Sequence, residues 1–137
     1  MTWLVDTNVI SEIRKGARCH PGVLRWWRDT APDDLFLSVL VIGEIRRGIA
    51  RASVHDPVKA AVLTSWLAAM ITTYSDRILP VSPAIAEIWG RISAPRPVPV
   101  IDALLAATAI VHDLTLVTRN VADTAGLGAR ILDPFAG

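Results

Sequence analysis

Short apolar runs alternate along this chain with longer stretches that have helical periodicity. Five runs are short enough to be buried strands, and they cover residues 3–5, 35–38, 78–81, 114–118 and 130–132. Continuous short runs are typical of parallel strands, because both faces of a parallel sheet are covered. Strands that alternate with helices form such a sheet with helices on both sides. We therefore expect an α/β fold, a three-layer α/β/α domain whose central parallel sheet has four to five strands.

The predicted helices carry start signals and apolar stripes. Prolines follow Asp56 and Ser82, so each proline takes the first helical position and the residue before it caps the helix. Apolar residues recur at intervals of three and four, which is the spacing of one helix face. One stripe comprises Val58, Val62, Trp66, Ala69 and Thr73, and the next comprises Ile85, Ile88, Trp89 and Ile92. No repeat or linker interrupts the pattern, so we expect residues 1–137 to form a single domain.

The composition narrows the class of protein. Hydrophobic residues make up 52% of the 137 residues and the mean hydropathy is +0.41, which leaves apolar surface for a partner or a second copy. No apolar run approaches the roughly 18 residues of a membrane-spanning helix, and Asp6 interrupts any secretory leader. Cys19 is the single cysteine, which excludes a disulfide framework and a cysteine-based zinc site. We expect a cytoplasmic protein that has no membrane contact.

The excess of Arg over Lys among the basic residues has two possible explanations. A net charge of +1 at pH 7 provides no whole-molecule field that would attract nucleic acid. All but two of the 14 basic residues are Arg, whose planar fork binds phosphate through two hydrogen bonds. A GC-rich genome produces the same bias without a functional cause, so the arginine content alone favours neither explanation.

Four acids occupy positions at which ligand chemistry gathers. Asp6 directly follows the predicted strand at residues 3–5, and ligands of open α/β sheets collect at the carboxyl ends of parallel strands. Glu44, Asp102 and Asp123 occupy comparable positions in later elements. Their joint placement predicts one shared acidic pocket.

Two of these acids also have ordinary structural interpretations. Asp6 could be a turn residue, with Asn8 as the N-cap of a helix over residues 9–15. Glu44 could be a solvated residue at the margin of a helix over residues 39–52. Both interpretations stay open at the level of the sequence.

The other two acids differ in how well an ordinary role fits. Asp102 shares one face of a predicted helix, residues 101–112, with apolar and small side chains, and such a face admits an acid only as a cap or as a ligand. The other members of that face are Leu105, Ala106 and Ala109. Asp123 lies in a predicted loop, residues 119–123, where an Asp commonly makes a turn.

Four converging carboxylates predict a bound cation. Their mutual repulsion raises pKa values unless positive charge is supplied. No Lys or His lies near these positions in the sequence, and His20, His55 and His112 show no metal-ligand spacing. A hard divalent cation meets the need, and a ligand set made only of oxygen atoms favours Mg²⁺ or Mn²⁺ over zinc.

Five motifs give the chain a resemblance to a known family. They are Leu4-Val5-Asp6-Thr7-Asn8-Val9-Ile10-Ser11-Glu12, Ile42-Gly43-Glu44-Ile45-Arg46-Arg47-Gly48, the run from Ile101 to Ala109, the run from Leu116 to Asp123, and Ile131-Leu132-Asp133-Pro134-Phe135. In this order they resemble the motifs of PIN-domain ribonucleases, and more narrowly those of the VapC-type toxins of type II toxin–antitoxin pairs. The resemblance spans essentially the whole chain.

The resemblance implies a Mg²⁺-dependent endoribonuclease that hydrolyses RNA phosphodiester bonds, with Mn²⁺ as a possible substitute. It makes Asp6 and Asp102 the direct metal ligands. Glu44 and Asp123 would act through water, hold a second ion or orient the nucleophile. The groups that would position these acids are Asn8, Thr118 and Asn120.

One departure from the family pattern leaves a ligand position open. The family often has Phe after the fourth Asp, and this chain has Thr124. Some relatives carry an acid where Asn120 stands, so either Asn120 or Asp123 is the residue that serves the metal.

Partners follow from the same resemblance. It implies an RNA substrate, a homodimer and a cognate antitoxin protein. We expect RNA phosphates to contact Arg46 or Arg47 and Arg119, although a solvated surface role is the competing interpretation for each. The alternative function is a catalytically weak module that keeps the fold and binds nucleic acid or protein. Retention of all four acids argues against that alternative.

Overall fold

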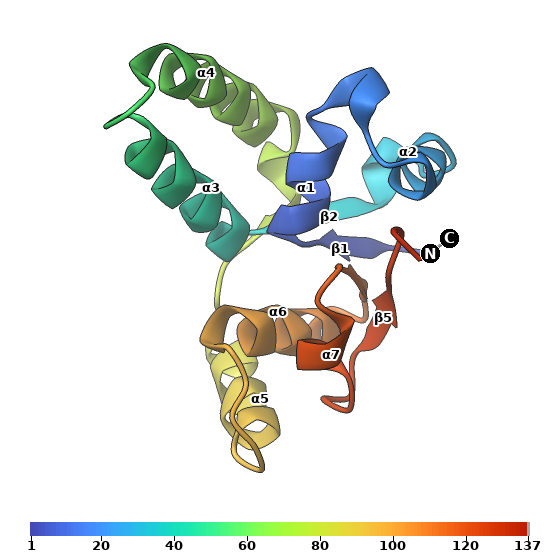
Figure 1. The fold of residues 1–137 in the computed structure, drawn as a ribbon. Coiled ribbons are helices and arrows are strands. Elements are labelled where there is room, and N and C mark those ends of the chain that lie inside the picture. The colour runs from blue at the N-terminus through green and yellow to red at the C-terminus, as the bar shows by residue number, and fades with distance from the viewer. Residues whose placement is uncertain (137) are drawn as a thin grey trace.

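The computed structural model describes residues 1–136 and contains a five-stranded parallel sheet between two layers of helices (Figure 1). The order of the strands across the sheet is β3-β2-β1-β4-β5, and every neighbouring pair is parallel. The strands are β1 (Trp3–Val5), β2 (Leu35–Ser38), β3 (Ile78–Leu79), β4 (Thr115–Val117) and β5 (Arg130–Leu132). The predicted three-layer α/β/α fold is confirmed.

The path of the chain makes a switch point beside β1. The chain moves from β1 outward to β2 and β3, and then returns to β4 on the other side of β1. The first four helices cover one face of the sheet and the last three cover the other (Figure 1). The helices are α1 (Thr7–Ile13), α2 (Pro21–Arg28), α3 (Val39–Ala52), α4 (Pro57–Thr73), α5 (Pro83–Ser93), α6 (Val100–Val111) and α7 (Val121–Thr124). In open parallel sheets the crevice at such a switch point is the usual place for a ligand.

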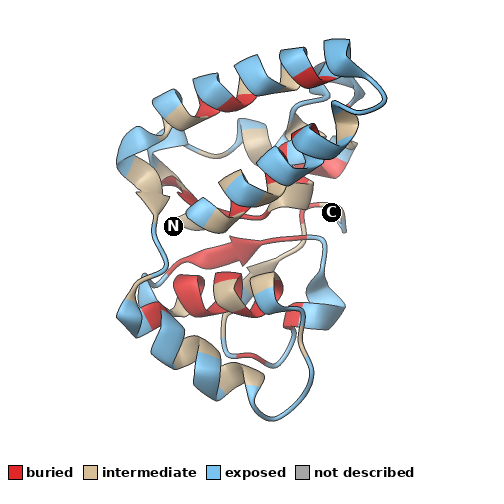
Figure 2. Ribbon diagram, turned by 90° about the vertical axis from the view of Figure 1, so that its left-hand side faces the viewer, coloured by how far each residue is buried: buried red, intermediate tan, exposed pale blue. Residues whose placement is uncertain are grey.

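The core lies on both faces of the two central strands. Leu4 and Val5 of β1 and Leu116 and Val117 of β4 are fully buried. Figure 2 shows the buried residues facing inward from the helices above and below the sheet. This burial on both faces explains why these strands read as continuous apolar runs. No helix in the described part of the chain combines the length and apolarity needed to cross a lipid bilayer.

The two predicted proline helix starts and their caps are confirmed. The side chain of Asp56 accepts a hydrogen bond of 3.1 Å from the backbone N–H of Lys59, and Ser82 accepts one of 3.2 Å from that of Ile85. Pro57 and Pro83 open α4 and α5. A proline costs nothing there, because the first N–H groups of a helix have no partner within the helix.

The predicted apolar stripe of α4 is wrong. Val58 is 76% exposed and Val62 is 62% exposed, whereas the buried residues of this helix are Ala60, Leu67 and Met70. The side chains of α4 are apolar or small almost all the way round, so periodicity alone does not single out one face. Packing against α3 instead selects the face that is buried.

Several predicted boundaries also differ from the structure. The first helix begins at Thr7 with Asp6 as its N-cap, so the interpretation of Asn8 as the N-cap of a helix over residues 9–15 is wrong. The strand predicted at residues 78–81 ends at Leu79, because proline follows and has no N–H for the ladder.

Three further differences lie in the C-terminal part of the chain. Asp123 lies in the short helix α7 and not in a loop. The helix predicted over residues 101–112 spans Val100–Val111, a shift of one residue, and the strand predicted over 114–118 is shorter by one residue at each end.

Burial predicts how substitutions on the two faces of α4 affect stability. Leu67 is fully buried, so Leu67→Ala should lower the free energy of unfolding by about 2–5 kcal/mol through lost packing and a cavity. Val62→Ala on the exposed face should change it by less than about 0.5 kcal/mol. Urea unfolding followed by tryptophan fluorescence measures both. Equal losses for the two variants would contradict the described orientation of α4.

Candidate acidic site

Asp6 occupies the switch point of the sheet. Its backbone N–H donates to the carbonyl of Val117 at 2.9 Å, which extends the β1–β4 pairing by one residue. Its Oδ1 accepts a hydrogen bond of 2.7 Å from the backbone N–H of Thr7, and its Oδ2 accepts one of 2.7 Å from Oγ1 of Thr118. The residue is 3% exposed. Asp6 is therefore a buried, doubly anchored N-cap and not a solvated turn residue.

The residues predicted to position the acids connect β1 with the segment after β4. The fully buried hydroxyl group of Thr118 donates to Asp6 and accepts from the backbone N–H of Asn120 at 3.0 Å. Oδ1 of Asn8 accepts a 3.3 Å hydrogen bond from the backbone N–H of Arg119, while Nδ2 of Asn8 lies 3.5 Å from Oδ2 of Asp6. Thr118 and Asn8 thus lie beside Asp6, and Asn120 is joined to Asp6 through Thr118. Their role in positioning the acids stays a prediction.

Glu44 is half-buried on α3 and faces the start of α1. Its Oε1 accepts a 2.6 Å hydrogen bond from Oγ1 of Thr7. This contact joins two helices that follow neighbouring strands, so the interpretation of Glu44 as a freely solvated residue is wrong. Thr7 was not among the predicted site residues. Its position could have indicated a role, because Thr7 carries a hydroxyl group, directly follows the Asp at the end of β1 and opens α1.

Asp102 is buried without acting as a cap. It is 9% exposed and stands third in α6, whose N-cap is Pro99 and has no side-chain capping hydrogen bond. The capping interpretation is therefore wrong. The predicted apolar face around Asp102 is confirmed, because Leu105, Ala106 and Ala109 are all buried.

The acids interact electrostatically across the sheet edge. Burial raises the pKa of Asp6 above its usual value, hydrogen bonds from Thr118 and Thr7 lower it, and the charges of Asp102 and Glu44 raise it again. The pKa of Asp102 is likewise raised mainly by burial. A hydrogen bond with Asn120 lowers that pKa, and the charges of Asp123 and Glu44 raise it. The four predicted acids thus form one group in which the charges of the neighbouring acids act on Asp6 and Asp102.

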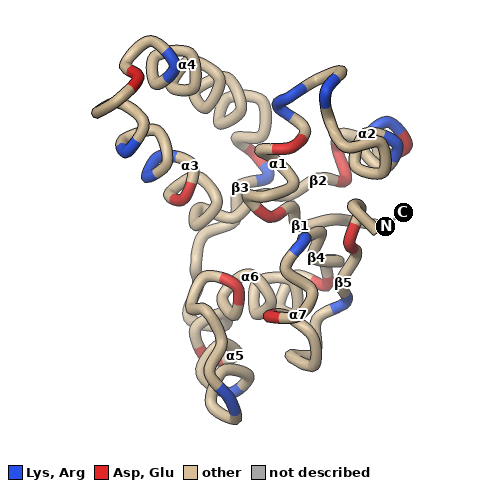
Figure 3. The backbone as a smooth tube through the Cα atoms, viewed as in Figure 1, with Lys and Arg blue, Asp and Glu red and all other residues tan. Residues whose placement is uncertain are grey.

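The four acids come from elements on both sides of the sheet, and no basic side chain in the described residues forms an ion pair with them. Figure 3 shows acidic residues between β1 and α1 and on α3, α6 and α7. Within residues 1–136, the acids that form ion pairs are Glu12, Asp33, Asp76 and Asp113, and none of these belongs to the group. Unpaired carboxylates of this kind have the donor chemistry that a hard divalent cation requires.

The side chains of the acids do not form a complete set of metal ligands in the described residues. In the described residues, no three His, Cys, Asp or Glu side chains are grouped closely enough to hold one ion together. Asp123 is exposed on α7, and its segment is tethered by Arg96, whose Nη2 donates to the carbonyls of Asp123 at 3.3 Å and Ala125 at 2.7 Å. The residues fit a divalent cation by chemistry and charge, and their role as ligands stays a prediction.

The three predicted RNA-binding arginines are exposed near these acids. Arg47 and Glu44 line the same surface hollow, and Arg46 precedes Arg47 on α3. Arg119 follows Thr118 directly, and its guanidinium carbon lies 4.6 Å from the ring centroid of Phe135. Their role in binding RNA stays a prediction.

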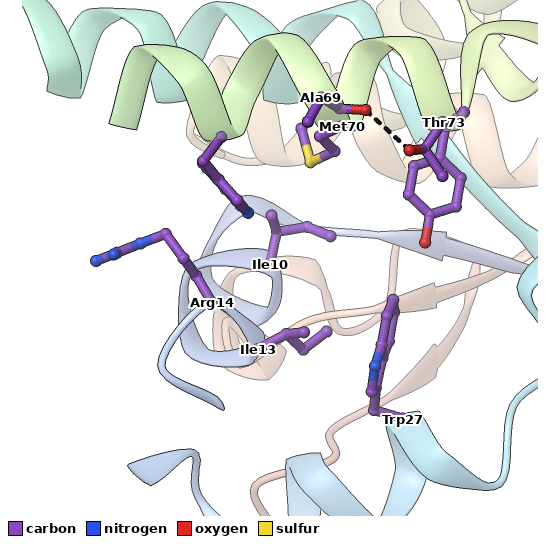
Figure 4. Close-up of a pocket in the computed structure, with 9 residues that line it drawn as sticks. Ile10, Ile13, Arg14, Trp27, Ala69, Met70 and Thr73 are labelled. Carbon is purple, nitrogen blue, oxygen red and sulfur yellow. Dashed lines mark hydrogen bonds between the residues drawn. The ribbon is translucent and has the colours of Figure 1, made fainter. Parts of the chain in front are cut away.

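An apolar cleft is separate from the acids. It has a volume of about 410 Å³ and lies between α1, α2 and α4 (Figure 4). Ile10, Trp27 and Met70 give it an apolar lining, and Arg14 stands at its margin over the ring of Trp66. No carboxylate lines this cleft, so it offers a surface for contact rather than a site for hydrolysis.

Comparison with known proteins finds a family match and similarity to proteins named as toxins and ribonucleases. The PIN domain family matches residues 3–122. The chain is 28% identical over 144 residues to Toxin FitB of Neisseria gonorrhoeae, covering 96% of this chain and 97% of that protein. It is 27% identical over 138 residues to a VapC ribonuclease of Sinorhizobium fredii, covering 96% of each. The fold matches the crystal structure of FitAcB from Neisseria gonorrhoeae with a TM-score of 0.87 and 28% identity, covering 98% of this chain and 99% of that one.

The raised pKa of Asp102 predicts how stability depends on pH in EDTA. The folded state keeps a proton that the unfolded state releases above its pKa of 3.8, so stability falls as pH rises through that value and on through the folded-state pKa. Asp102→Asn should therefore melt at a higher temperature than the wild type at pH 7 and lose this advantage near pH 3.

Thermal melts across this pH range measure the difference. Glu87→Gln, which removes an exposed carboxylate from α5, is the matched control and should track the wild type. An Asp102→Asn protein less stable than the wild type at pH 7 would contradict the described burial.

Proposed function

The chain belongs to the PIN domain family, and we propose that it is a metal-dependent endoribonuclease that acts as the toxin of a toxin–antitoxin pair. The observation that carries the proposal is the burial of Asp6 and Asp102 beside the switch point of a parallel sheet, with no ion-pair partner for either within residues 1–136. Buried carboxylates without an ion-pair partner cost stability, so the burial of Asp6 and Asp102 favours a functional role for them. The similarity to proteins named as a toxin and as a ribonuclease supports the same conclusion.

Burial divides the four acids of the proposed metal site into direct ligands and residues with indirect roles. Asp6 and Asp102, the two buried members, would hold Mg²⁺ or Mn²⁺ directly, and Glu44 and Asp123 would act through water or hold a second ion. When bound, such an ion supplies a Lewis acid for the scissile phosphate and favours hydrolysis by water near neutral pH.

The residues around these acids would maintain their geometry. Each oxygen of Asp6 accepts one strong hydrogen bond and keeps lone-pair capacity for a further ligand. The bond from Thr118 holds the carboxylate at the crevice and favours its charged form. Thr7 engages Oε1 of Glu44, which leaves Oε2 to accept a hydrogen bond from the attacking water.

The exposed arginines would bind the substrate backbone. Arg47 beside Glu44 and Arg119 beside Thr118 flank the acids from two sides, and Arg46 extends the first of these positions. Phosphate contacts of this kind supply affinity and position without reading the base sequence. They would also offset the repulsion between the acids and the RNA.

Protein partners complete the proposal. The name of the similar toxin supports a cognate antitoxin, and the resemblance implies a homodimer. Exposed Val54, Val58 and Val62 and the apolar cleft of Figure 4 provide surface that a protein partner could bury.

A weak binding module is the second candidate function. The observation in its favour is that no three acids within residues 1–136 already enclose an ion position. Metal-dependent stabilisation discriminates between the two functions, because an ion that binds only the folded state must raise its stability.

Carboxylate substitutions test the hydrolytic site. Asp6→Asn and Asp102→Asn should each abolish RNA cleavage in Mg²⁺ while leaving the far-UV circular dichroism spectrum unchanged, because each removes one charge and little volume. Thr118→Val should reduce cleavage about 10- to 100-fold, as is usual for residues that orient metal ligands. Glu87→Gln is the control. Cleavage at the wild-type rate by either Asp variant would refute the ligand assignment.

Thermal melting tests the metal. The wild-type protein should melt at a higher temperature in Mg²⁺ than in EDTA, by the equivalent of about 2.7 kcal/mol when the ion is present at 100 times its dissociation constant. Asp102→Asn should lose most of this response. A wild-type protein whose melting is identical in both solutions would favour the weak binding module.

A further inference from the structure

The C-terminal segment after β5 brings together two residues that are far apart in the sequence. The guanidinium carbon of Arg119 lies 4.6 Å from the centroid of the Phe135 ring. The ring of His20, the N-cap of α2, lies 5.3 Å from Phe135 between centroids and is tilted by 58°. The backbone N–H of Phe135 donates to Oδ1 of Asp133 at 2.9 Å, which fixes the turn that carries the ring.

His20 braces the ring from a fixed position. Its Nδ1 accepts a 3.1 Å hydrogen bond from the backbone N–H of Gly22, and the backbone N–H of His20 donates to Oε2 of Glu12 at 3.1 Å. The imidazole therefore has a defined orientation against Phe135. The ring of Phe135 is contacted by Arg119 and by His20, so it is already engaged and not a free surface.

Arg119 combines an anchored backbone with an uncommitted charge. Its backbone N–H donates to Asn8 beside Asp6. In the described part of the chain, its guanidinium group takes part in no ion pair or hydrogen bond, and the Phe135 ring is the contact that orients it. Arg77 also lies over an aromatic ring, that of Tyr74, but its charge is engaged by Asp76 at 3.1 Å.

A stacked guanidinium keeps its hydrogen-bonding capacity. Stacking on a ring occupies the flat face of the group, whereas its N–H donors point outward in the plane. An ion pair with a carboxylate would consume those donors. The contact with Phe135 therefore restricts the rotamers of Arg119 while leaving its donors available for an anion.

We propose that Phe135 is a positioning residue that holds Arg119 in the orientation that binds an RNA phosphate next to the acids. The inference rests on the proposed ribonuclease function, because that function supplies the phosphate. Phe135 itself touches no substrate. It lowers the conformational freedom that Arg119 would otherwise lose when RNA binds.

A double-mutant cycle tests the coupling between the two residues. The single variants are Phe135→Leu and Arg119→Gln, and the third protein carries both. Binding of a random-sequence, fluorescently labelled single-stranded RNA is measured by anisotropy at several salt concentrations, and cleavage of the same RNA gives kcat and KM. Phe135→Leu should weaken binding and raise KM about two- to fivefold, the range of a cation–π contact at an exposed site, with kcat unchanged.

The cycle should be strongly non-additive. In the Arg119→Gln background, Phe135→Leu should have no further effect on RNA affinity. Arg119→Gln should also lower the slope of log K against log salt by about 0.7, the value for one phosphate contact of a single strand. Phe135→Tyr should restore wild-type affinity, because it keeps the ring.

Phe36→Leu is the matched control. Phe36 is the other phenylalanine of the chain and packs against the core from β2, so the control repeats the substitution away from Arg119. It should leave RNA affinity unchanged, whatever it costs in melting temperature.

The outcomes separate this inference from the proposed function. An equal loss of affinity on Phe135→Leu in both backgrounds would overturn the inference and indicate that the ring contacts RNA directly. Wild-type affinity in Phe135→Leu would overturn it as well. A wild-type protein that neither binds nor cleaves RNA would overturn the proposed function together with the inference. Cleavage that Asp6→Asn abolishes, combined with an additive cycle, would overturn the inference alone.

Discussion

The hydrogen bond between Thr118 and Asp6 joins the fold of this protein to its proposed chemistry. A carboxylate that is 3% exposed is costly to keep charged, and burial raises its pKa accordingly. The Thr118 hydroxyl and the Thr7 backbone N–H each lower that cost by donating to the charged form. The Thr118 donor is in place because β1 and β4 are parallel neighbours that end at the same edge, whereas the Thr7 donor belongs to the helix that Asp6 caps. The strand order thus brings Thr118 to Asp6 and so supplies one of the two donors that favour its charged form.

Charge is organised in two zones around this edge. The inner zone holds the four acids, whose members Asp6 and Asp102 have pKa values raised mainly by burial and further by neighbouring carboxylates. None of the four has a cationic side chain as an ion-pair partner within residues 1–136. The outer zone holds exposed arginines, of which Arg119 rests on an aromatic ring and not on an acid. An arginine that neutralised the inner acids would remove the attraction for a metal ion. Keeping the zones apart leaves the centre free for a divalent cation and the margin free for phosphate, which suits hydrolysis of a polyanion.

The sequence predicted most of the sheet and the neighbourhood of the acids, for identifiable reasons. Buried parallel strands are continuous apolar runs, so β1, β2 and β5 were predicted with their correct ends. Asp102 was informative because an acid on an apolar helix face loses hydration when that face is buried, so it indicates a specific role. The buried face of α4 was not predictable, because an apolar helix has no unique face until it packs. The bond between Thr7 and Glu44 joins residues 37 positions apart, and their pairing depends on how α1 and α3 lie in space.

The central claim is that Asp6 and Asp102 bind the same divalent cation at the switch point. Anomalous X-ray scattering from crystals grown with Mn²⁺ tests it most directly, because the signal locates the ion without reference to activity. We predict one Mn²⁺ peak within about 2.0–2.3 Å of a carboxylate oxygen of each residue, the usual range for oxygen ligands of ions of this size. A peak bound to other residues, or no peak at this edge at saturating Mn²⁺, would contradict the claim.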